Sequence, residues 1–290
     1  MERKRIIFKT AAWGFIIFII SILIFSYSFK RIRNLQINNK RNLQNGRILN
    51  KKTKEHHPSI DCLLLLAREP LGRTMYVWGG GWNEEDTGAG AEAVTLGVSL
   101  IWERFAKEQD ADYDFNQTRY QIHNGLDCSG YIGWLVYNLL ETENGKEGYV
   151  VKSSEMAKFL AQKGLGEYTE NAKVVDWKPG DIMSMKGHVW MSLGSCEDGS
   201  VVVLHASPPG VTLSGTLLED GSESMAVKLA KKYMKEKFPK WYEKYQVKPC
   251  EYKYLTDSSR MRWGKDILED KDGLQEKTAE EILMWMFDKS

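Results

Sequence analysis

The chain has 290 residues, of which 42% are hydrophobic and 27% are charged, and this length accommodates one large folded domain or two small ones. The formal net charge of +1 conceals an uneven distribution, because 13 of the 40 Lys and Arg residues but only two of the 39 acidic residues lie within residues 1–57. The rest of the chain therefore holds 27 basic and 37 acidic residues, and so acidic a body argues against a nucleic-acid-binding protein.

Residues 11–29 form an uncharged run of 19 residues that is rich in Ile and Phe. At a helical rise of about 1.5 Å per residue, this run is long enough to cross a bilayer core of roughly 30 Å. A cleaved secretory signal is the alternative, because Ser26-Tyr27-Ser28 fits a cleavage site, although the apolar part of such signals usually has only about 7–15 residues. We expect residues 1–29 to be a cytoplasmic tail and one retained transmembrane helix.

Residues 30–57 carry nine Lys and Arg residues, repeated Asn and Gln, and few apolar positions. A segment of this composition cannot build a hydrophobic core, so we predict a basic tether. Its positive charge suits an anionic membrane or cell-wall surface.

From residue 58 onward the sequence shows the periodicity of a folded domain. Apolar residues at helical spacing predict helices over 60–69, 94–107, 128–140, 154–162, 223–237 and 278–287. Extended runs bounded by glycine predict strands over 74–78, 181–186, 188–193 and 201–205. Helices followed by strands indicate an α+β domain with an antiparallel sheet. We expect this domain to span 58–215, with an insertion at about 82–124, and a helical C-terminal extension over 216–290 to pack on it.

The cysteines do not form a metal-binding pattern. Cys62, Cys128, Cys196 and Cys250 are widely spaced and no C-x-x-C pair occurs, which argues against a zinc knuckle. The glycines in residues 88–93 fit a loose dinucleotide-binding pattern, but a polar segment precedes them where that motif needs a buried strand. We therefore expect neither a metal nor a cofactor.

Cys128 begins the clearest predicted helix, and Asp127 before it is suited to cap that helix. The free N–H groups and the positive dipole end of a helix lower the pKa of a thiol, from about 8.5 to roughly 3.5–7.5 beside an imidazolium. Cys128 is therefore a candidate thiolate nucleophile, whose own N–H could face a developing oxyanion. The alternative is a cysteine that packs in the core, which the flanking Asp, Ser and Gly residues make less favourable.

Two histidines on the predicted strands could serve this thiol. If 188–193 and 200–205 form a hairpin, Leu193 faces Ser200 and His188 faces His205. Both imidazoles then project from the same face of the sheet, with Cβ atoms roughly 4.5–5.5 Å apart. We expect one histidine to act as a base and the other to orient it.

Four blocks of sequence together carry a resemblance to a known family. They are Tyr76-Val77-Trp78-Gly79-Gly80, Asp127-Cys128-Ser129-Gly130, Pro179-Gly180-Asp181-Ile182 followed by His188-Val189, and Leu204-His205-Ala206-Ser207. In this order, over roughly residues 58–215, they resemble the NlpC-type cysteine peptidases of bacterial cell walls. The resemblance implies a papain-like α+β core, with the nucleophile at a helix N-terminus packed on an antiparallel sheet. It also implies hydrolysis of peptidoglycan stem peptides, often between D-glutamate and the diamino acid.

The resemblance also assigns roles to single residues. It implies that Cys128 is the nucleophile, His188 the base, His205 the third polar group, Tyr76 a hydroxyl near the nucleophile, and Asp127 and Ser129 neighbours of the subsite for the amino end of the stem peptide. Tyr76 and Trp78 could instead pack in the core, and for Trp78 we expect this.

The chain departs from the family pattern around the expected cleft. The gap from Gly81 to Asp127 and the turn between the histidines are longer, Trp190 replaces a small residue, and Pro208-Pro209 follows Ser207. These differences affect the identity of the substrate more than the chemistry. Two alternatives stay open: an N-acetylmuramoyl-L-alanine amidase, and a non-catalytic wall-binding module that has kept the fold.

The location of the protein is a conflict between charge and substrate. The flank after the predicted anchor is the more basic one, and the positive-inside tendency would place the body in the cytoplasm. Peptidoglycan lies outside the membrane, and on this ground we expect a single-pass membrane protein with an extracytoplasmic catalytic domain. The expected partners are peptidoglycan or muropeptides and, through residues 11–29, the membrane, but no nucleic acid.

Overall fold

The computed structural model describes residues 58–140 and 148–288. The described residues belong to one compact unit. The predicted anchor (11–29) and tether (30–57) lie outside the described residues. Among the helices of the described part, none is long and apolar enough to cross a bilayer.

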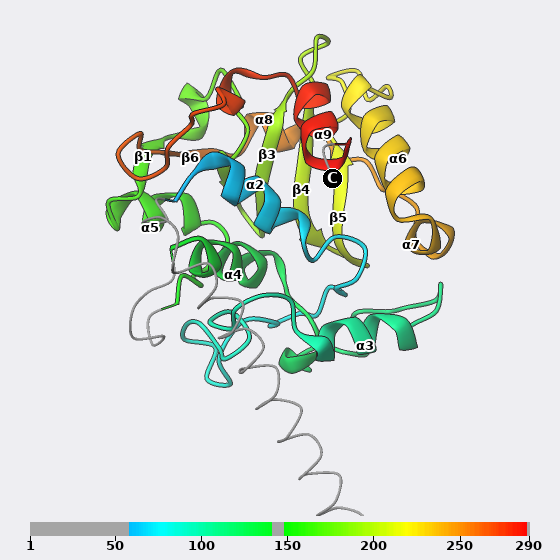
Figure 1. Cartoon of the computed structure of the whole chain (residues 1–290). Helices are drawn as coiled ribbons and strands as arrows, with labels where there is room; N and C mark the ends of the chain where they lie inside the picture. Colours follow the sequence, from blue (N-terminus) through cyan, green and yellow to red (C-terminus); the bar gives the residue numbers. More distant parts are fainter. Residues whose placement is uncertain (1–57, 141–147, 289–290) are drawn as a thin grey trace, which may run out of the picture. The chain divides into compact units, whose positions relative to one another are not determined.

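Six strands form one sheet in the order β1-β6-β2-β3-β4-β5, and every neighbouring pair is antiparallel (Figure 1). The strands are β1 (Gly166–Thr169), β2 (Ile182–Met185), β3 (His188–Ser195), β4 (Val201–Ser207), β5 (Gly210–Gly215) and β6 (Ser259–Trp263). The predicted α+β class with an antiparallel sheet is confirmed.

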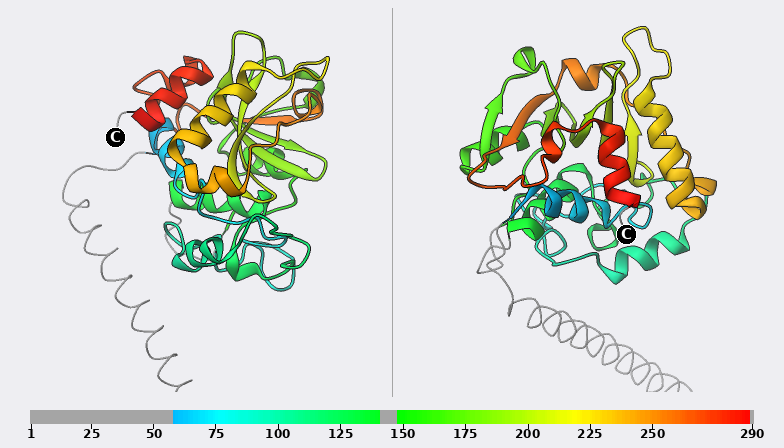
Figure 2. Two further views of the ribbon diagram at one scale, coloured as in Figure 1. Left: turned by 90° about the vertical axis from the view of Figure 1, so that its right-hand side faces the viewer. Right: turned by 45° about the horizontal axis from the view of Figure 1, so that its top comes forward.

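Helices cover both faces of this sheet. The α-helices are α2 (Ile60–Arg68), α3 (Leu100–Glu108), α4 (Cys128–Leu140), α5 (Met156–Gln162), α6 (Met225–Lys237), α7 (Pro239–Lys244), α8 (Lys253–Thr256) and α9 (Ala279–Asp288). Three short 3-10 turns are η1 (Ile122–Asn124), η2 (Asn171–Lys173) and η3 (Leu274–Glu276). In Figure 1, α2, α4 and α9 lie in front of the sheet and α8 lies behind it, while Figure 2 shows α6 running alongside the edge strand β5.

Alternation along β3 separates two hydrophobic clusters. Val189, Met191 and Leu193 belong to the main core, which they share with α4. Trp190 points to the other face and packs in a smaller cluster that includes Cys250. Because side chains alternate along a strand, His188 shares the face of Trp190.

Helix α4 places Cys128 at its first residue. Every residue of this helix except Leu140 is buried. Asp127 caps it, because its Oδ1 accepts the backbone N–H of Gly130 at 2.7 Å. A Cβ on Gly130 would lie only 2.0 Å from the carbonyl oxygen of Gly80, so no side chain fits there. This close approach fixes the beginning of α4 against residues 76–80.

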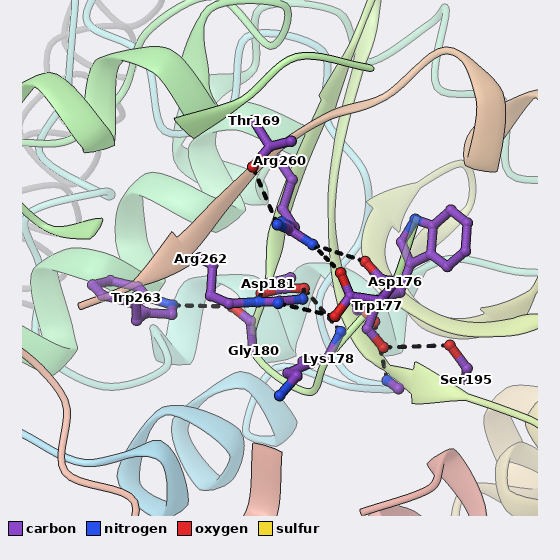
Figure 3. Close-up of polar contacts among 12 residues, drawn as sticks. Thr169, Asp176, Trp177, Lys178, Gly180, Asp181, Ser195, Arg260, Arg262 and Trp263 are labelled. Atoms are coloured by element: carbon purple, nitrogen blue, oxygen red, sulfur yellow. Dashed lines mark hydrogen bonds and ion pairs between the residues drawn. The ribbon is translucent and has the colours of Figure 1, made fainter. Parts of the chain in front are cut away.

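The C-terminal extension is not helical throughout, because it contributes β6 to the middle of the sheet. Arg262 of β6 donates to both carboxylate oxygens of the buried Asp181, from Nε at 2.9 Å and from Nη2 at 2.6 Å (Figure 3). Arg260 donates to Asp176 at 2.5 Å, and Arg262 reaches the same carboxylate at 3.0 Å. These ion pairs tie β6 to the loop before β2, so residues 216–290 are part of the folded domain and not a layer added to it.

The predicted helices at 60–69, 128–140, 223–237 and 278–287 are found within two residues of their expected ends. The helix predicted over 94–107 begins only at Leu100, where the hydroxyl of Ser99 accepts the N–H of Ile101 and caps it. Strands β1, β5 and β6 were not predicted.

Candidate active site

Cys128 is only 7% exposed and lies where α4 meets the beginning of β3. Burial is the main reason why the pKa of its thiol is raised to about 12, and the carboxylate of Asp127 raises it further. The backbone N–H groups of Val189, Ser129 and Cys128 itself point to the sulfur and act in the opposite direction. The expectation of a lowered thiol pKa is therefore wrong for this structure, because desolvation outweighs the helix N-terminus.

The two predicted histidines are in direct contact. Nε2 of His188 lies 2.9 Å from Nδ1 of His205, and the two ring planes are nearly perpendicular at 77°. Since one nitrogen of this contact must carry the hydrogen and the other must accept it, the contact couples the tautomers of the two rings. It also leaves Nδ1 of His188 as the nitrogen available to another partner.

The register that brings them together differs from the predicted one. Met191 pairs with Leu204, and one further step along the ladder sets Trp190 opposite His205. The predicted pairing of His188 with His205 across the hairpin is therefore wrong by two residues. A shift of two keeps every side chain on its predicted face, so the same-face prediction is confirmed and the imidazoles meet diagonally.

Both histidines are held in the neutral state. Burial lowers the pKa of His188 to about 4, and burial together with the neighbouring ring of His188 lowers the pKa of His205 well below its usual range. The thiol and the imidazoles are thus all uncharged near pH 7.

The sulfur of Cys128 reaches the strand that carries His188 through the N–H of Val189, the next residue along the chain. Within the described residues, no hydrogen bond joins the sulfur to either imidazole. Cys128 and His188 therefore lie close together where α4 meets β3, but no hydrogen bond joins their side chains in the described part of the chain.

Asp127 and Ser129, which flank the cysteine, are both bonded within the site. The Asp127 carboxylate accepts from Ser129 Oγ at 2.9 Å and from the N–H of Gly79 at 3.3 Å, and Ser129 Oγ accepts the indole N–H of Trp82 at 3.1 Å. Burial raises the pKa of Asp127 to about 6, against the effect of these hydrogen bonds. Both residues therefore order the beginning of α4, and their role beside a stem-peptide subsite stays a prediction.

Tyr76 lies at the same junction. It is 7% exposed, packs edge-on against Phe115 with ring centroids 5.5 Å apart, and donates its backbone N–H to the carbonyl of Pro209 at 2.8 Å. Burial raises the pKa of its hydroxyl, and the proximity of Cys128 raises it further. Because Cys128 influences the pKa of the Tyr76 hydroxyl, the two groups lie near each other, as the sequence predicts.

Trp78 is 43% exposed, so the expectation that it packs in the core is wrong. Its ring is covered instead by the guanidinium of Arg119, 4.9 Å from the ring centroid.

The sequence did not predict a role for Tyr254, which lies in the short helix α8. Its ring lies 5.5 Å from the ring of His188, 6.3 Å from that of His205 and 5.8 Å from that of Trp190. Tyr254 therefore packs against both histidines. It also lines, with His205, a cavity of about 70 Å³. Nothing in the local sequence marks this tyrosine, because its role depends on a contact across about fifty residues.

No family model matches the chain, and no curated protein and no solved structure matches it either. The functional assignment therefore rests on the residues of the site and on the local resemblance of the four sequence blocks.

Proposed function

We propose that the protein is a membrane-anchored cysteine peptidase, with a papain-like core, that hydrolyses amide bonds in peptidoglycan stem peptides at the D-glutamyl-diamino acid position. The observation that carries the proposal is a cysteine at a helix N-terminus whose sulfur touches the backbone beside His188, while His188 is bonded to His205 at 2.9 Å. Nucleophile, base and orienting group are the three parts that such chemistry requires.

The neutral resting state favours one order of events. As Cys128 attacks the substrate carbonyl carbon, Nδ1 of His188 takes the thiol proton, and the imidazolium is stabilised by the ring of His205. His188 then gives this proton to the leaving amine, which breaks the amide bond and leaves a thioester. Water, deprotonated by the same imidazole, hydrolyses the thioester and restores the thiol. General acid–base help of this kind contributes roughly 10²–10⁴-fold to the rate.

Burial supports this mechanism in a second way. A charged sulfur is costly in the closed site, so proton transfer during the attack avoids a free thiolate. The predicted anchor at residues 11–29 would hold the catalytic body on the outer face of the membrane, next to its polymeric substrate, and the mechanism needs no metal or cofactor.

The test is digestion of defined muropeptides by the full chain, with the products identified by mass spectrometry. Cys128→Ala should abolish cleavage with the fold intact, whereas the matched variant Cys196→Ala should cleave like the parent, because Cys196 follows the last residue of β3, at the end opposite His188. Undiminished cleavage by Cys128→Ala would refute the assignment. Release of stem peptides with an intact L-alanine amino end would instead identify an N-acetylmuramoyl-L-alanine amidase.

The buried, neutral thiol favours a second candidate, a wall-binding module without activity. In that case the chain would sediment with purified sacculi and release no soluble fragments, and Cys128 would not react with a thiol-directed electrophile in their presence. Fragment release by the parent protein would exclude this candidate.

A further inference from the structure

A cation and two aromatic rings meet on the surface next to the candidate site. The guanidinium of Arg119 lies 4.9 Å from the ring centroid of Trp78 and 6.0 Å from that of Tyr120. Trp78 is 43% exposed and Tyr120 is 64% exposed, although both are large apolar side chains. We call these three residues the arginine patch.

Backbone contacts fix the arginine patch to the residues around Cys128. The N–H of Tyr120 donates to the carbonyl of Trp78 at 2.8 Å, and the N–H of Gly79 donates to the carboxylate of Asp127 at 3.3 Å. Trp78 is also only two residues from Tyr76, whose hydroxyl pKa responds both to Cys128 and to Arg119. The patch is therefore an extension of the candidate site.

Tyr120 adopts a backbone conformation that side-chain-bearing residues rarely take, with a φ of 62°. Such a strained conformation persists only where the surrounding contacts enforce it. Tyr120 directly follows Arg119, whose guanidinium lies over the rings of both Trp78 and Tyr120.

The guanidinium of Arg119 has no ion pair and no hydrogen bond within the part of the chain that the structure describes, and stacking on Trp78 leaves its edge open. A planar guanidinium with a free edge binds a carboxylate through two parallel N–H···O bonds. The aromatic rings beside it offer apolar contact to the aliphatic part of such a ligand.

We propose that the arginine patch binds a free carboxylate of the peptide substrate next to the amide that Cys128 attacks, and so selects stems with a free carboxylate over stems in which it is amidated. This inference rests on the proposed function, because it is that function which places a peptide at Cys128. The specificity is carried by Arg119, which lies within the insertion at 82–124.

The experiment compares two stem peptides that differ only in the carboxylate next to the scissile bond, one free and one converted to the carboxamide. The full chain should cleave the free acid with a kcat/KM roughly 10-fold to 100-fold higher, which is the range of a charge-assisted hydrogen bond to a carboxylate. Arg119→Gln should lower kcat/KM for the free acid by this factor and leave kcat/KM for the carboxamide peptide unchanged. Arg119→Lys should fall between, because a lysine keeps the charge but not the two parallel donors.

The matched control is Arg104→Gln, which removes an exposed arginine of the same insertion, on α3, that lies on no aromatic ring among the described residues. It should leave both kcat/KM values unchanged. An equal loss on both peptides in Arg119→Gln, or no loss on either, would overturn the inference and leave the peptidase assignment standing.

Binding separates the inference from the proposed function. The Cys128→Ala variant should bind the free acid more tightly than the amide by the same factor, measured by calorimetry, and Arg119→Gln on that background should abolish the difference. Selective binding without turnover by the parent would retain the patch and reject the peptidase. Equal affinity for both peptides would reject the patch whatever the turnover.

Discussion

The titration of Cys128 gives a direct test of the neutral resting state. A thiol with a pKa of about 12 has only about one molecule in 10⁴ ionised at pH 8, and the thiolate is the form that reacts with alkylating agents. The rate of alkylation of Cys128 by iodoacetamide should therefore rise about tenfold per pH unit from pH 6 to pH 10, without a plateau. Steric protection of the sulfur would lower all rates by one factor and leave this slope unchanged.

The assay measures the modified Cys128 peptide by mass spectrometry, because Cys196 and Cys250 also have pKa values raised to about 11 by burial. A protein unfolded in urea is the reference and should level off near the ordinary cysteine pKa of about 8.5. His188→Ala should have the same pH dependence as the parent. A rate that is already level at pH 6 and falls in His188→Ala would show a thiolate–imidazolium pair, and the reasoning from burial would then be refuted.

Three further predictions concern buried ionisable residues. Arg262→Met removes the guanidinium that donates two hydrogen bonds to the buried Asp181 carboxylate, and it should lower the free energy of unfolding by about 3–5 kcal/mol. The double variant with Asp181→Asn should recover most of this loss, because no unpaired charge is then buried. A double variant as unstable as Arg262→Met would contradict this reasoning. His205→Gln should lower kcat/KM roughly 100-fold by misplacing the ring of His188, and parent activity in this variant would rule out an orienting role. The pKa of His205 is lowered on folding, so its neutral form adds stability that is complete above about pH 6.5 and is lost as the pH falls below it. Lowering the pH from 7 to 5 should therefore reduce the free energy of unfolding of the parent more than that of His205→Gln, as measured by chemical unfolding at each pH. If the free energy of unfolding falls equally in both proteins, the pKa of His205 is not lowered by folding.

Local patterns predicted the elements that bury one clear face. Helix α4 was placed to the residue, because Asp127 marks its beginning and its apolar residues are continuous. Strands β2 to β4 are predicted because glycines interrupt the extended runs before β2, between β2 and β3, and between β3 and β4. By contrast, β6 contains Arg260 and Arg262, which a sequence pattern assigns to the surface. These arginines are acceptable inside the sheet only because Asp176 and Asp181, about eighty residues earlier, neutralise them.

In the candidate site, too, the features set by neighbouring residues are predictable from the sequence, whereas those set by contacts between distant residues are not. The shared face of His188 and His205 follows from the period of two along a strand, and it was predicted. The register was not, because an irregularity between Ser192 and Ser195 changes the pairing near the turn, and alternation does not record it. The raised pKa of the Cys128 thiol differs from the prediction for a related reason: a position at a helix N-terminus can be read from the sequence, whereas the burial of that position in the fold cannot.

The place of β6 has a consequence for the synthesis of this protein. Residues 259–263 lie between β1 and β2, which are complete about seventy residues earlier in the chain. A nascent polypeptide that ends before Ser259 therefore lacks the strand that joins β1 to β2, and the hydrogen-bonding edges of β1 and β2 that face each other stay unpaired. The four strands β2 to β5 can pair without β6, but the six-stranded sheet is complete only after residue 263 has been synthesised.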